Sequence, residues 1–231
     1  MNISSAVIFL KVFTMNNPLP LLGITGYSGS GKTTLMNMLS GIYFPDEGQI
    51  FINGKEEVIR SPKDAFDLGI GMVHQHFKLI DVLSATENII LGLPGKLNLK
   101  EATKRVEEIC QKYGFEVDPK QKIYDMSVSQ KQTVEIVKVL YRGADILILD
   151  EPTAPLSTAE TERLFQMVEH LRKTEDIAIV FISHRLQEVK HICNSITIMR
   201  NGKVVENGPL NPERSINSIV TQMLGRSFDE N

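Results

Sequence analysis

The stretch of sequence that decides the fold is Gly26-Tyr-Ser-Gly-Ser-Gly-Lys-Thr33, which fits the pattern G-x-x-x-x-G-K-[ST]. An apolar segment, residues 21–25, precedes it as an expected strand, and residues 32–40 follow it as an expected helix. In that context the glycines let backbone N–H groups surround phosphate oxygens, with the positive end of the helix dipole behind them. The stretch therefore predicts a phosphate-binding loop.

The side chains of this loop have separate expected tasks. Lys32 is expected to reach the β- and γ-phosphates of a nucleotide, and the Thr33 hydroxyl is expected to ligate Mg²⁺. The alternative is a chance Gly/Ser turn, which the flanking strand and helix disfavour. The expected nucleotide-binding positions of the loop are Gly26, Tyr27, Ser28, Gly29, Ser30, Gly31, Lys32, Thr33 and Thr34.

Two acidic residues follow a second apolar run, residues 146–149. Asp150 ends that expected strand, and a carboxylate there can hold the Mg²⁺ opposite Thr33. Glu151 comes next and can accept a proton from, or orient, an attacking water. Acids at a strand end are common and weak as a signal on their own, but together with the phosphate loop they predict a nucleotide-hydrolysing site.

Composition limits the class of protein. The 231 residues contain 25 Lys and Arg against 28 Asp and Glu, a net charge of -3, with 42% hydrophobic residues. This excludes a disordered tail, a collagen-like repeat and a strongly basic nucleic-acid binder. The apolar run at residues 6–13 is too short to span a bilayer and lacks signal-peptide features. Cys110 and Cys193 have no metal-ligand spacing, so reduced, partly buried thiols of a cytosolic protein are expected.

Apolar runs and helical patterns alternate along the chain, which predicts an α/β fold with a mostly parallel sheet. Since 6% of residues are aromatic and Trp is absent, the core is expected to be aliphatic. The expected strands are residues 21–25, 49–52, 69–74, 146–149 and 177–182 and a hairpin at 195–205. The expected helices are residues 32–40, 100–112, 127–141, 158–173 and 215–224.

Four further motifs follow the phosphate loop in a fixed order: Gln75 in Val73-His-Gln-His-Phe77, then Met126-Ser-Val-Ser-Gln130, Leu149-Asp-Glu-Pro-Thr153 and Ser183-His-Arg185. This order resembles the ATP-binding-cassette (ABC) ATPases over about residues 35–225. The resemblance implies a P-loop NTPase fold with an inserted helical subdomain at about residues 84–142. The implied division is an atypical segment 1–20 with a truncated N-terminal β-hairpin, a cassette domain 21–225 and a tail 226–231.

The resemblance also implies a mechanism. Two cassettes close head to tail on ATP and Mg²⁺, so Ser127, Ser129 and Gln130 would complete the partner's site. Gln75 would sense the metal and the attacking water, and His184 would contact the γ-phosphate. The implied catalytic residues are Glu151, His184 and Gln75, and the implied metal ligands are Thr33, Gln75 and Asp150.

Within the family, the amino-acid sequence resembles the first cassette of simple-sugar and nucleoside importers. The resemblance lies in residues 71–77, 87–92, 134–138 and 141–150. This implies ATP hydrolysis that energises the import of a small solute. The implied partners are a second cassette, integral membrane permease subunits and, indirectly, an extracytoplasmic solute-binding protein, with no nucleic acid. The implied location is peripheral, on the cytoplasmic face of the membrane.

Several departures leave two alternatives open. Residues 15–34 look more like the start of the GTP-binding adaptor of molybdopterin guanine dinucleotide synthesis. Phe9 and Phe13 are poor counterparts of the aromatic residue that stacks on adenine, and Ser129 stands where the family has glycine. A Cβ there would crowd the partner's γ-phosphate, and it would be strained if φ is positive. Ser157 replaces a frequent Asp, which weakens coupling across the dimer. The second alternative is therefore a nucleotide-binding remnant with little catalysis.

Overall fold

The computed structural model describes residues 8–10, 21–95, 98–174 and 177–225. Its main sheet has six strands in the order β5-β6-β7-β2-β8-β9, and every neighbouring pair is parallel except the last. The α/β prediction with a mostly parallel sheet is confirmed. The strands are β2 (Leu21–Thr25), β5 (Ile70–Val73), β6 (Ile146–Asp150), β7 (Ala178–Ile182), β8 (Ser195–Arg200) and β9 (Lys203–Pro209).

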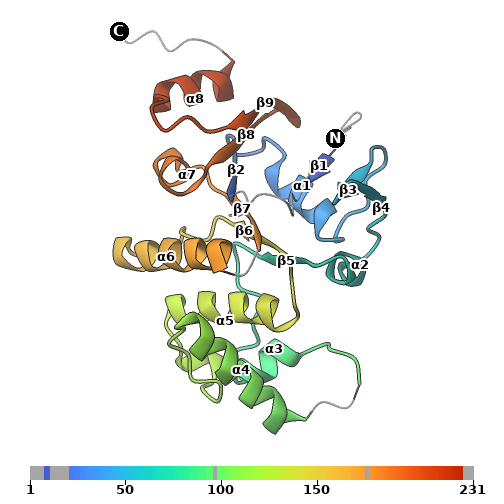
Figure 1. Ribbon diagram of the computed structural model, residues 1–231, viewed down its shortest axis with the longest axis vertical. Coiled ribbons are helices and arrows are strands. Elements are labelled where there is room, and N and C mark those ends of the chain that lie inside the picture. The colour runs from blue at the N-terminus through green and yellow to red at the C-terminus, as the bar shows by residue number, and fades with distance from the viewer. Residues whose placement is uncertain (1–7, 11–20, 96–97, 175–176, 226–231) are drawn as a thin grey trace.

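A smaller sheet lies to one side of the first helix (Figure 1). It has the order β1-β3-β4, with strands β1 (Ile8–Leu10), β3 (Ile50–Ile52) and β4 (Lys55–Glu57). The turn between β3 and β4 contains Asn53 and Gly54, both with positive φ, as a tight hairpin requires. Strand β1 runs parallel to β3 and is the described part of residues 1–20. Phe13 and the tail 226–231 lie outside the described residues, so the truncated N-terminal hairpin stays a prediction.

Helices pack on both faces of the main sheet, and three more form a separate layer at one end of the molecule (Figure 1). The helices against the sheets are α1 (Lys32–Leu39), α2 (Pro62–Asp67), α6 (Thr158–Thr174), α7 (Leu186–Ile192) and α8 (Ile216–Leu224). The separate helical layer contains α3 (Ala85–Ile90), α4 (Leu99–Tyr113) and α5 (Val128–Tyr141).

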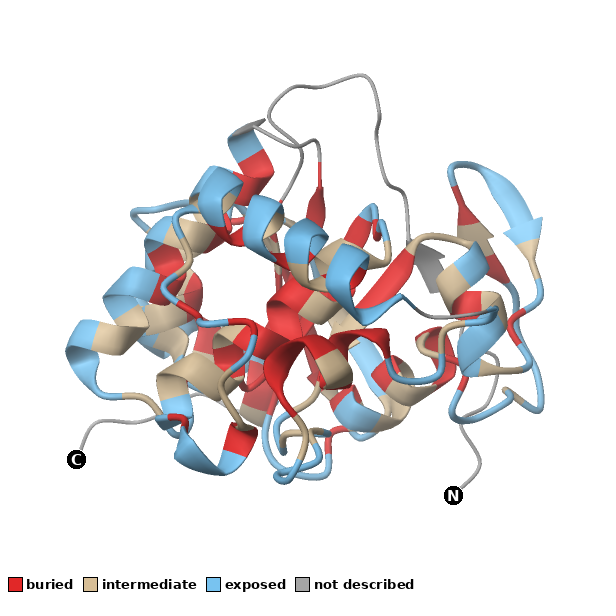
Figure 2. Ribbon diagram, turned by 90° about the horizontal axis from the view of Figure 1, so that it is seen from below, coloured by how far each residue is buried: buried red, intermediate tan, exposed pale blue. Residues whose placement is uncertain are grey.

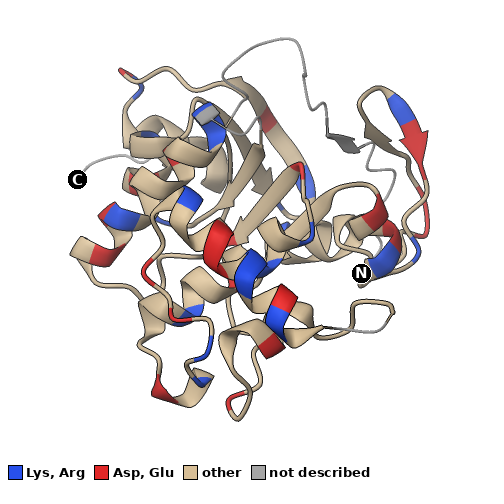
Figure 3. Cartoon of the chain, turned by 60° about the horizontal axis from the view of Figure 1, so that its bottom comes forward, with Lys and Arg blue, Asp and Glu red and all other residues tan. Residues whose placement is uncertain are grey.

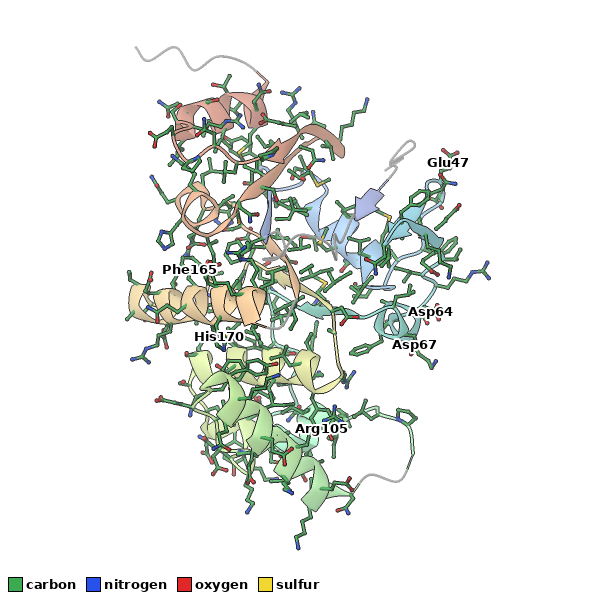
Figure 4. The ribbon with its side chains drawn as sticks, viewed as in Figure 1. Glu47, Asp64, Asp67, Arg105, Phe165 and His170 are labelled. Atoms are coloured by element: carbon green, nitrogen blue, oxygen red, sulfur yellow. The ribbon has the colours of Figure 1, made fainter. Side chains whose placement is uncertain are left out.

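The helical layer has its own apolar core, to which Ile89, Val106 and Val134 contribute fully buried side chains. Arg105 of α4 ties the helices together, because its guanidinium lies 4.5 Å from the Tyr141 ring centroid and donates to the Tyr141 carbonyl at 3.0 Å (Figure 4). The layer also contacts the sheet unit, where the rings of Tyr113 on α4 and His170 on α6 meet edge to face. The helices therefore form a packed unit that rests on α6.

Strands β6 and β7 are buried at every position, and Figure 2 shows the buried residues gathered along the centre of the molecule. The core is mainly aliphatic, as the composition predicted, and Met36 and Met38 are part of it. Both cysteines are free and buried, which confirms the prediction of unpaired thiols. Burial raises the pKa of the Cys110 thiol to about 11, with the Glu107 charge adding to the effect. Within the described ranges, no helix combines the length and apolar character that crossing a bilayer requires.

Candidate nucleotide-binding site

A cavity of about 850 Å³ lies where β2, β5, β6 and β7 end. Parallel strands place the residues that follow them at one edge of a sheet, which is where such folds bind ligands. The phosphate loop follows β2, Gln75 follows β5, Glu151 follows β6 and His184 follows β7. The predicted residues that line this one cavity are Gly26, Tyr27, Ser28, Gly29, Ser30, Gly31, Lys32, Thr33, Thr34, Gln75, Asp150, Glu151 and His184.

The phosphate loop has a backbone that only glycine accommodates easily. Gly29 and Gly31 have φ values of 77° and 98°, in the left-handed region. A Cβ on Gly26 would lie 2.4 Å from the Met199 carbonyl oxygen, so the loop also depends on a close approach to β8. The loop leads into α1, whose first turn presents backbone N–H groups to the cavity. The loop is therefore preshaped to bind an anion.

Lys32 lies at the centre of the loop and is buried. Its Nζ donates to the carbonyl oxygens of Gly26 at 2.7 Å and Tyr27 at 3.2 Å, and to Ser30 Oγ at 3.4 Å. Burial lowers the pKa of the Lys32 ammonium, and the nearby Glu151 and Asp150 charges partly oppose this. The cation is thus held by loop carbonyls at the point where phosphate charge would arrive.

Asp150 is 4% exposed at the end of β6. Burial raises the pKa of its carboxyl, the Glu151 charge raises it further, and the Lys32 charge lowers it. Together with the Thr33 hydroxyl and the Gln75 amide, it gives the cavity a set of oxygen donors. Oxygen donors of this kind are those that Mg²⁺ prefers, so the residues present fit this ion.

Glu151 and His184 are joined directly. The Glu151 Oε1 atom lies 2.8 Å from His184 Nδ1 and accepts the His184 backbone N–H at 3.1 Å. Glu151 has a φ of 48°, a strained conformation for a residue with a side chain, and its own N–H donates to the Ile182 carbonyl at 2.9 Å. These bonds connect the ends of β6 and β7 and hold the carboxylate at the cavity wall.

Gln75 is exposed, and the segment that contains it is fastened to the helical layer. The Lys78 backbone N–H donates to Glu135 Oε1 at 2.6 Å, and Glu135 is a buried residue of α5. His74 faces a different cavity, where burial and then the charges of Lys78 and Lys138 lower the pKa of its imidazole. His74 lines that second cavity and His76 is exposed, so the two histidines that flank Gln75 are not gathered into one site.

Ser127, Ser129 and Gln130 lie apart from the nucleotide cavity, in a separate cavity of about 710 Å³ between α5 and α6. Ser127 caps α5, and its Oγ accepts the Gln130 N–H while the Gln130 Oε1 accepts the Ser127 N–H. Ser129 lies inside α5, and positive φ among non-glycine residues of the described ranges occurs at Asn53, Glu151 and Asn201. Ser129 was expected to be strained only if its φ were positive. Its φ is not positive, so this strain does not arise.

Four residues of the nucleotide cavity were missed by sequence reasoning: Asn201, Gly202, Lys203 and Met223. Asn201 and Gly202 form the β8–β9 turn and Lys203 begins β9, a hairpin that the sequence predicted with no indication of a binding role. The turn docks on the phosphate loop, because the Gly202 N–H donates to the Ser30 carbonyl at 3.0 Å. No local signal marks this contact, since it joins residues about 170 positions apart.

Comparison with known proteins gives consistent results. A family model described as ABC transporter matches residues 14–154. This range includes residues 15–34, whose sequence taken alone suggested a GTP-binding adaptor. The nucleoside import ATP-binding protein NupA of Lactococcus lactis is 47% identical over 208 residues, which are 88% of this chain and 41% of NupA. The ribose import ATP-binding protein RbsA of Clostridium perfringens is 37% identical, over 90% of this chain and 42% of RbsA. The chain thus spans about two fifths of the length of these relatives.

A solved structure supports the fold independently. The ADP conformation of MJ1267, an ATP-binding cassette of an ABC transporter, superposes with a TM-score of 0.76 at 24% identity. The superposition covers 90% of this chain and 88% of MJ1267. At this identity the likeness speaks for the architecture, a six-stranded sheet with a helical layer beside it.

Proposed function

The chain belongs to the ABC transporter family as an ATP-binding cassette, and on this premise we propose that it hydrolyses ATP to energise the import of a small solute, a nucleoside or a sugar. The observation that supports this most is the single cavity that unites the phosphate loop with Gln75, Asp150, Glu151 and His184. The names of NupA and RbsA, a nucleoside and a ribose importer, support the choice of solute classes.

The geometry fits hydrolysis of the terminal phosphate. Loop N–H groups and the Lys32 ammonium bind the β- and γ-phosphates, while the Glu151 carboxylate accepts a proton from the attacking water. The water oxygen bonds to the γ-phosphorus, the bond to the β,γ-bridging oxygen breaks, and ADP and phosphate leave. His184, bonded to Glu151, orients the carboxylate and is positioned to contact the γ-phosphate.

Mg²⁺ belongs to this proposal as the ion that neutralises charge on the bound phosphates. Thr33, Gln75 and Asp150 would hold it, because they bring a hydroxyl, an amide and a carboxylate oxygen to the cavity. The pKa of Asp150 is raised because burying its ionised carboxylate costs free energy. A bound cation would offset that free energy.

The arrangement of a head-to-tail pair of cassettes is part of the same proposal. Ser127, Ser129 and Gln130 line a cavity separate from the phosphate loop, so they are available to a second cassette's nucleotide. The start of α5, which Ser127 caps, would then point at the partner's γ-phosphate. The second cassette is either another copy of this chain or a homologous cassette.

The remaining partners are membrane proteins. We place the chain on the cytoplasmic face of the membrane, bound to permease subunits that receive solute from an extracytoplasmic binding protein. Lys and Arg are interspersed with Asp and Glu along the ribbon in Figure 3, and the net charge is -3, which suits docking through local contacts. The import names of the two relatives support these partners.

The Glu151→Gln variant tests the proposal. We expect ATP hydrolysis to fall about 100-fold or more, because the amide cannot accept the proton. We also expect ATP with Mg²⁺ to convert the variant into a stable dimer, since the bound nucleotide persists. Hydrolysis is measured by phosphate release, and size by light scattering, with ATP and GTP compared.

The matched control is Glu213→Gln, which changes an exposed glutamate outside the cavity and is expected to keep the wild-type rate. A Glu151→Gln variant that stays monomeric at saturating ATP would contradict the head-to-tail arrangement. A strong preference for GTP would instead favour the adaptor function that residues 15–34 suggested.

A further inference from the structure

A second connection joins the loops that hold Glu151 and His184, and it is made by Glu188 of α7. The Glu188 Oε2 atom accepts the Thr153 hydroxyl at 2.6 Å and the Ser183 hydroxyl at 3.2 Å. Thr153 lies two residues after Glu151, and Ser183 lies directly before His184. A single carboxylate oxygen therefore receives one hydrogen bond from each catalytic loop.

Burial makes these bonds consequential. Thr153 and Ser183 are both fully buried, so neither hydroxyl has water as a substitute partner. Arg185 closes the arrangement, because its Nη1 donates to Glu188 Oε1 at 3.1 Å and to the Thr153 carbonyl at 3.3 Å. Its backbone N–H donates to Ser183 Oγ at 3.0 Å. We call these four residues, Thr153, Ser183, Arg185 and Glu188, the Glu188 clamp.

The packing of helix α7 on β2 fixes the position of Glu188 relative to the phosphate loop. Val189, the next residue, is fully buried, and a Cβ on Gly23 of β2 would come within 2.7 Å of its Cγ1 atom. The helix therefore packs directly on the strand that leads into the phosphate loop. Glu188 also lies in the first turn of α7, where the helix dipole favours a negative charge.

We propose that Glu188 is a positioning residue, which fixes the Glu151–His184 pair relative to the phosphate loop. The inference rests on the proposed function, since the pair acts on the γ-phosphate. None of Thr153, Arg185 and Glu188 lines the nucleotide cavity as the described residues form it, so the clamp acts through the catalytic pair. Its loss lowers the rate of the chemical step, which depends on sub-ångström placement, and spares ATP binding by the loop.

Steady-state hydrolysis by the full chain tests this, with whichever membrane partners the wild type needs for activity. We expect Glu188→Ala to lower kcat about tenfold or more while KM for ATP changes less than about twofold. Glu188→Gln is expected to rescue most of kcat, because its amide oxygen still accepts both hydroxyls. Gln187→Ala, at an exposed neighbour on α7, is the matched control and is expected to match the wild type.

A double-mutant cycle separates the clamp from a general loss of stability. Thr153→Val removes one of the two hydroxyls, and we expect the Thr153→Val/Glu188→Ala variant to be about as slow as Glu188→Ala alone. If Glu188→Ala does not fold, two other variants still test the proposal. We expect Thr153→Val to have a lowered kcat and Glu188→Gln to have a near-normal kcat. A Glu188→Ala kcat within twofold of wild type, or additive effects of the two changes, would overturn it.

Hydrogen exchange gives a readout that needs no activity. In Glu188→Ala we expect faster exchange of the His184 and Arg185 amides, which donate to Glu151 Oε1 and Ser183 Oγ, with unchanged exchange in α1. Unchanged exchange at both amides would overturn the clamp whatever the rate of hydrolysis. Faster exchange in a chain whose wild type hydrolyses no ATP, even with membrane partners, would leave the clamp standing and overturn the proposed function.

Discussion

At the residue scale, the nucleotide cavity holds charges that the ligand-free protein would be more stable without. Burial raises the pKa of Asp150 above its unfolded value, so the folded chain binds its proton more tightly than the unfolded chain does. The contribution of this one carboxyl to the stability of the ligand-free chain consequently falls as the pH rises from its unfolded pKa through its folded pKa, and is level above it. Function thus keeps a carboxylate where stability alone disfavours one.

Replacing Asp150 by Asn removes this penalty. We expect Asp150→Asn to raise the stability of the nucleotide-free chain at pH 8 by about 1 kcal/mol, or roughly 2–4 °C in Tm, while abolishing hydrolysis. The gain is expected to shrink as the pH falls towards 3.5, because an increasing share of both states of the wild type then binds the proton. Thermal unfolding from pH 3.5 to pH 8 measures it.

Asp46→Asn, at an exposed aspartate, is the control and is expected to leave Tm unchanged. An Asp150→Asn variant that is less stable than the wild type at pH 8 would show that the carboxylate is a net stabilising group.

Residues of the candidate site were predictable where their motifs are local. The phosphate loop, Asp150 and Glu151 were predictable from local sequence patterns, whereas Gln75 and His184 were expected from the motif order that resembles the ABC ATPases. Lys203 and Met223 were missed because their place in the cavity depends on how a distant hairpin and α8 pack. Glu188 was missed for the same reason, since its hydrogen-bond partner Thr153 lies 35 positions earlier.

At the scale of elements, the missed helices are the short ones. α2 has six residues and α7 has seven, too few for an apolar period to repeat. α2 does have a local start signal, Ser61 followed by Pro62 and Asp64, and the Ser61 hydroxyl accepts the Asp64 N–H. α7 begins without a side-chain cap, so its position is set by packing on β2.

The hydrogen bond between Glu135 and Lys78 joins α5 to the loop that follows β5, and its removal is expected to be costly. Glu135→Ala would leave the Lys78 N–H without its acceptor and Lys138, 4.0 Å away, without its counter-charge. We expect a loss of about 2–3 kcal/mol in the free energy of unfolding, measured by urea titration.

Glu135→Gln is the matched variant, because its amide oxygen can still accept the Lys78 N–H. It is expected to lose about half as much or less. Equal losses in the two variants would mean that the charge, rather than the hydrogen bond, holds the Gln75 segment to α5.

At the scale of the whole molecule, the helical layer and the sheet have separate apolar cores. Ile89 is fully buried in the helical core, which includes no residue of the described strands of the main sheet. We expect Ile89→Ala to cost about 2–5 kcal/mol in local stability of α3, α4 and α5 and to leave ATP affinity within about twofold.

Hydrogen exchange of the helical amides measures the first effect, and calorimetric ATP titration the second. Ile148→Ala, in the core of the sheet unit, is the contrasting variant and is expected to lower protection across β5, β6 and β7. Parallel loss of protection in both units by Ile89→Ala would show that they unfold together.

The fold class was predictable from alternating apolar runs, but the order of strands was not. Nothing near residues 21–25 indicates that β2 lies between β7 and β8, because pairing is decided by contacts across most of the chain. The boundaries of β6 and β7 were predictable within a residue, since both strands are continuous apolar runs buried on both faces.

That placement of β2 has a consequence in time. The strand is synthesised early, yet both of its neighbours lie about 150 residues or more further on. At synthesis rates of about 5–20 residues per second, the ribosome takes roughly 8 to 30 seconds longer to supply them. During that interval the apolar strand has unpaired edges that other proteins can contact. We therefore expect chaperones to bind the strand that leads into the phosphate loop.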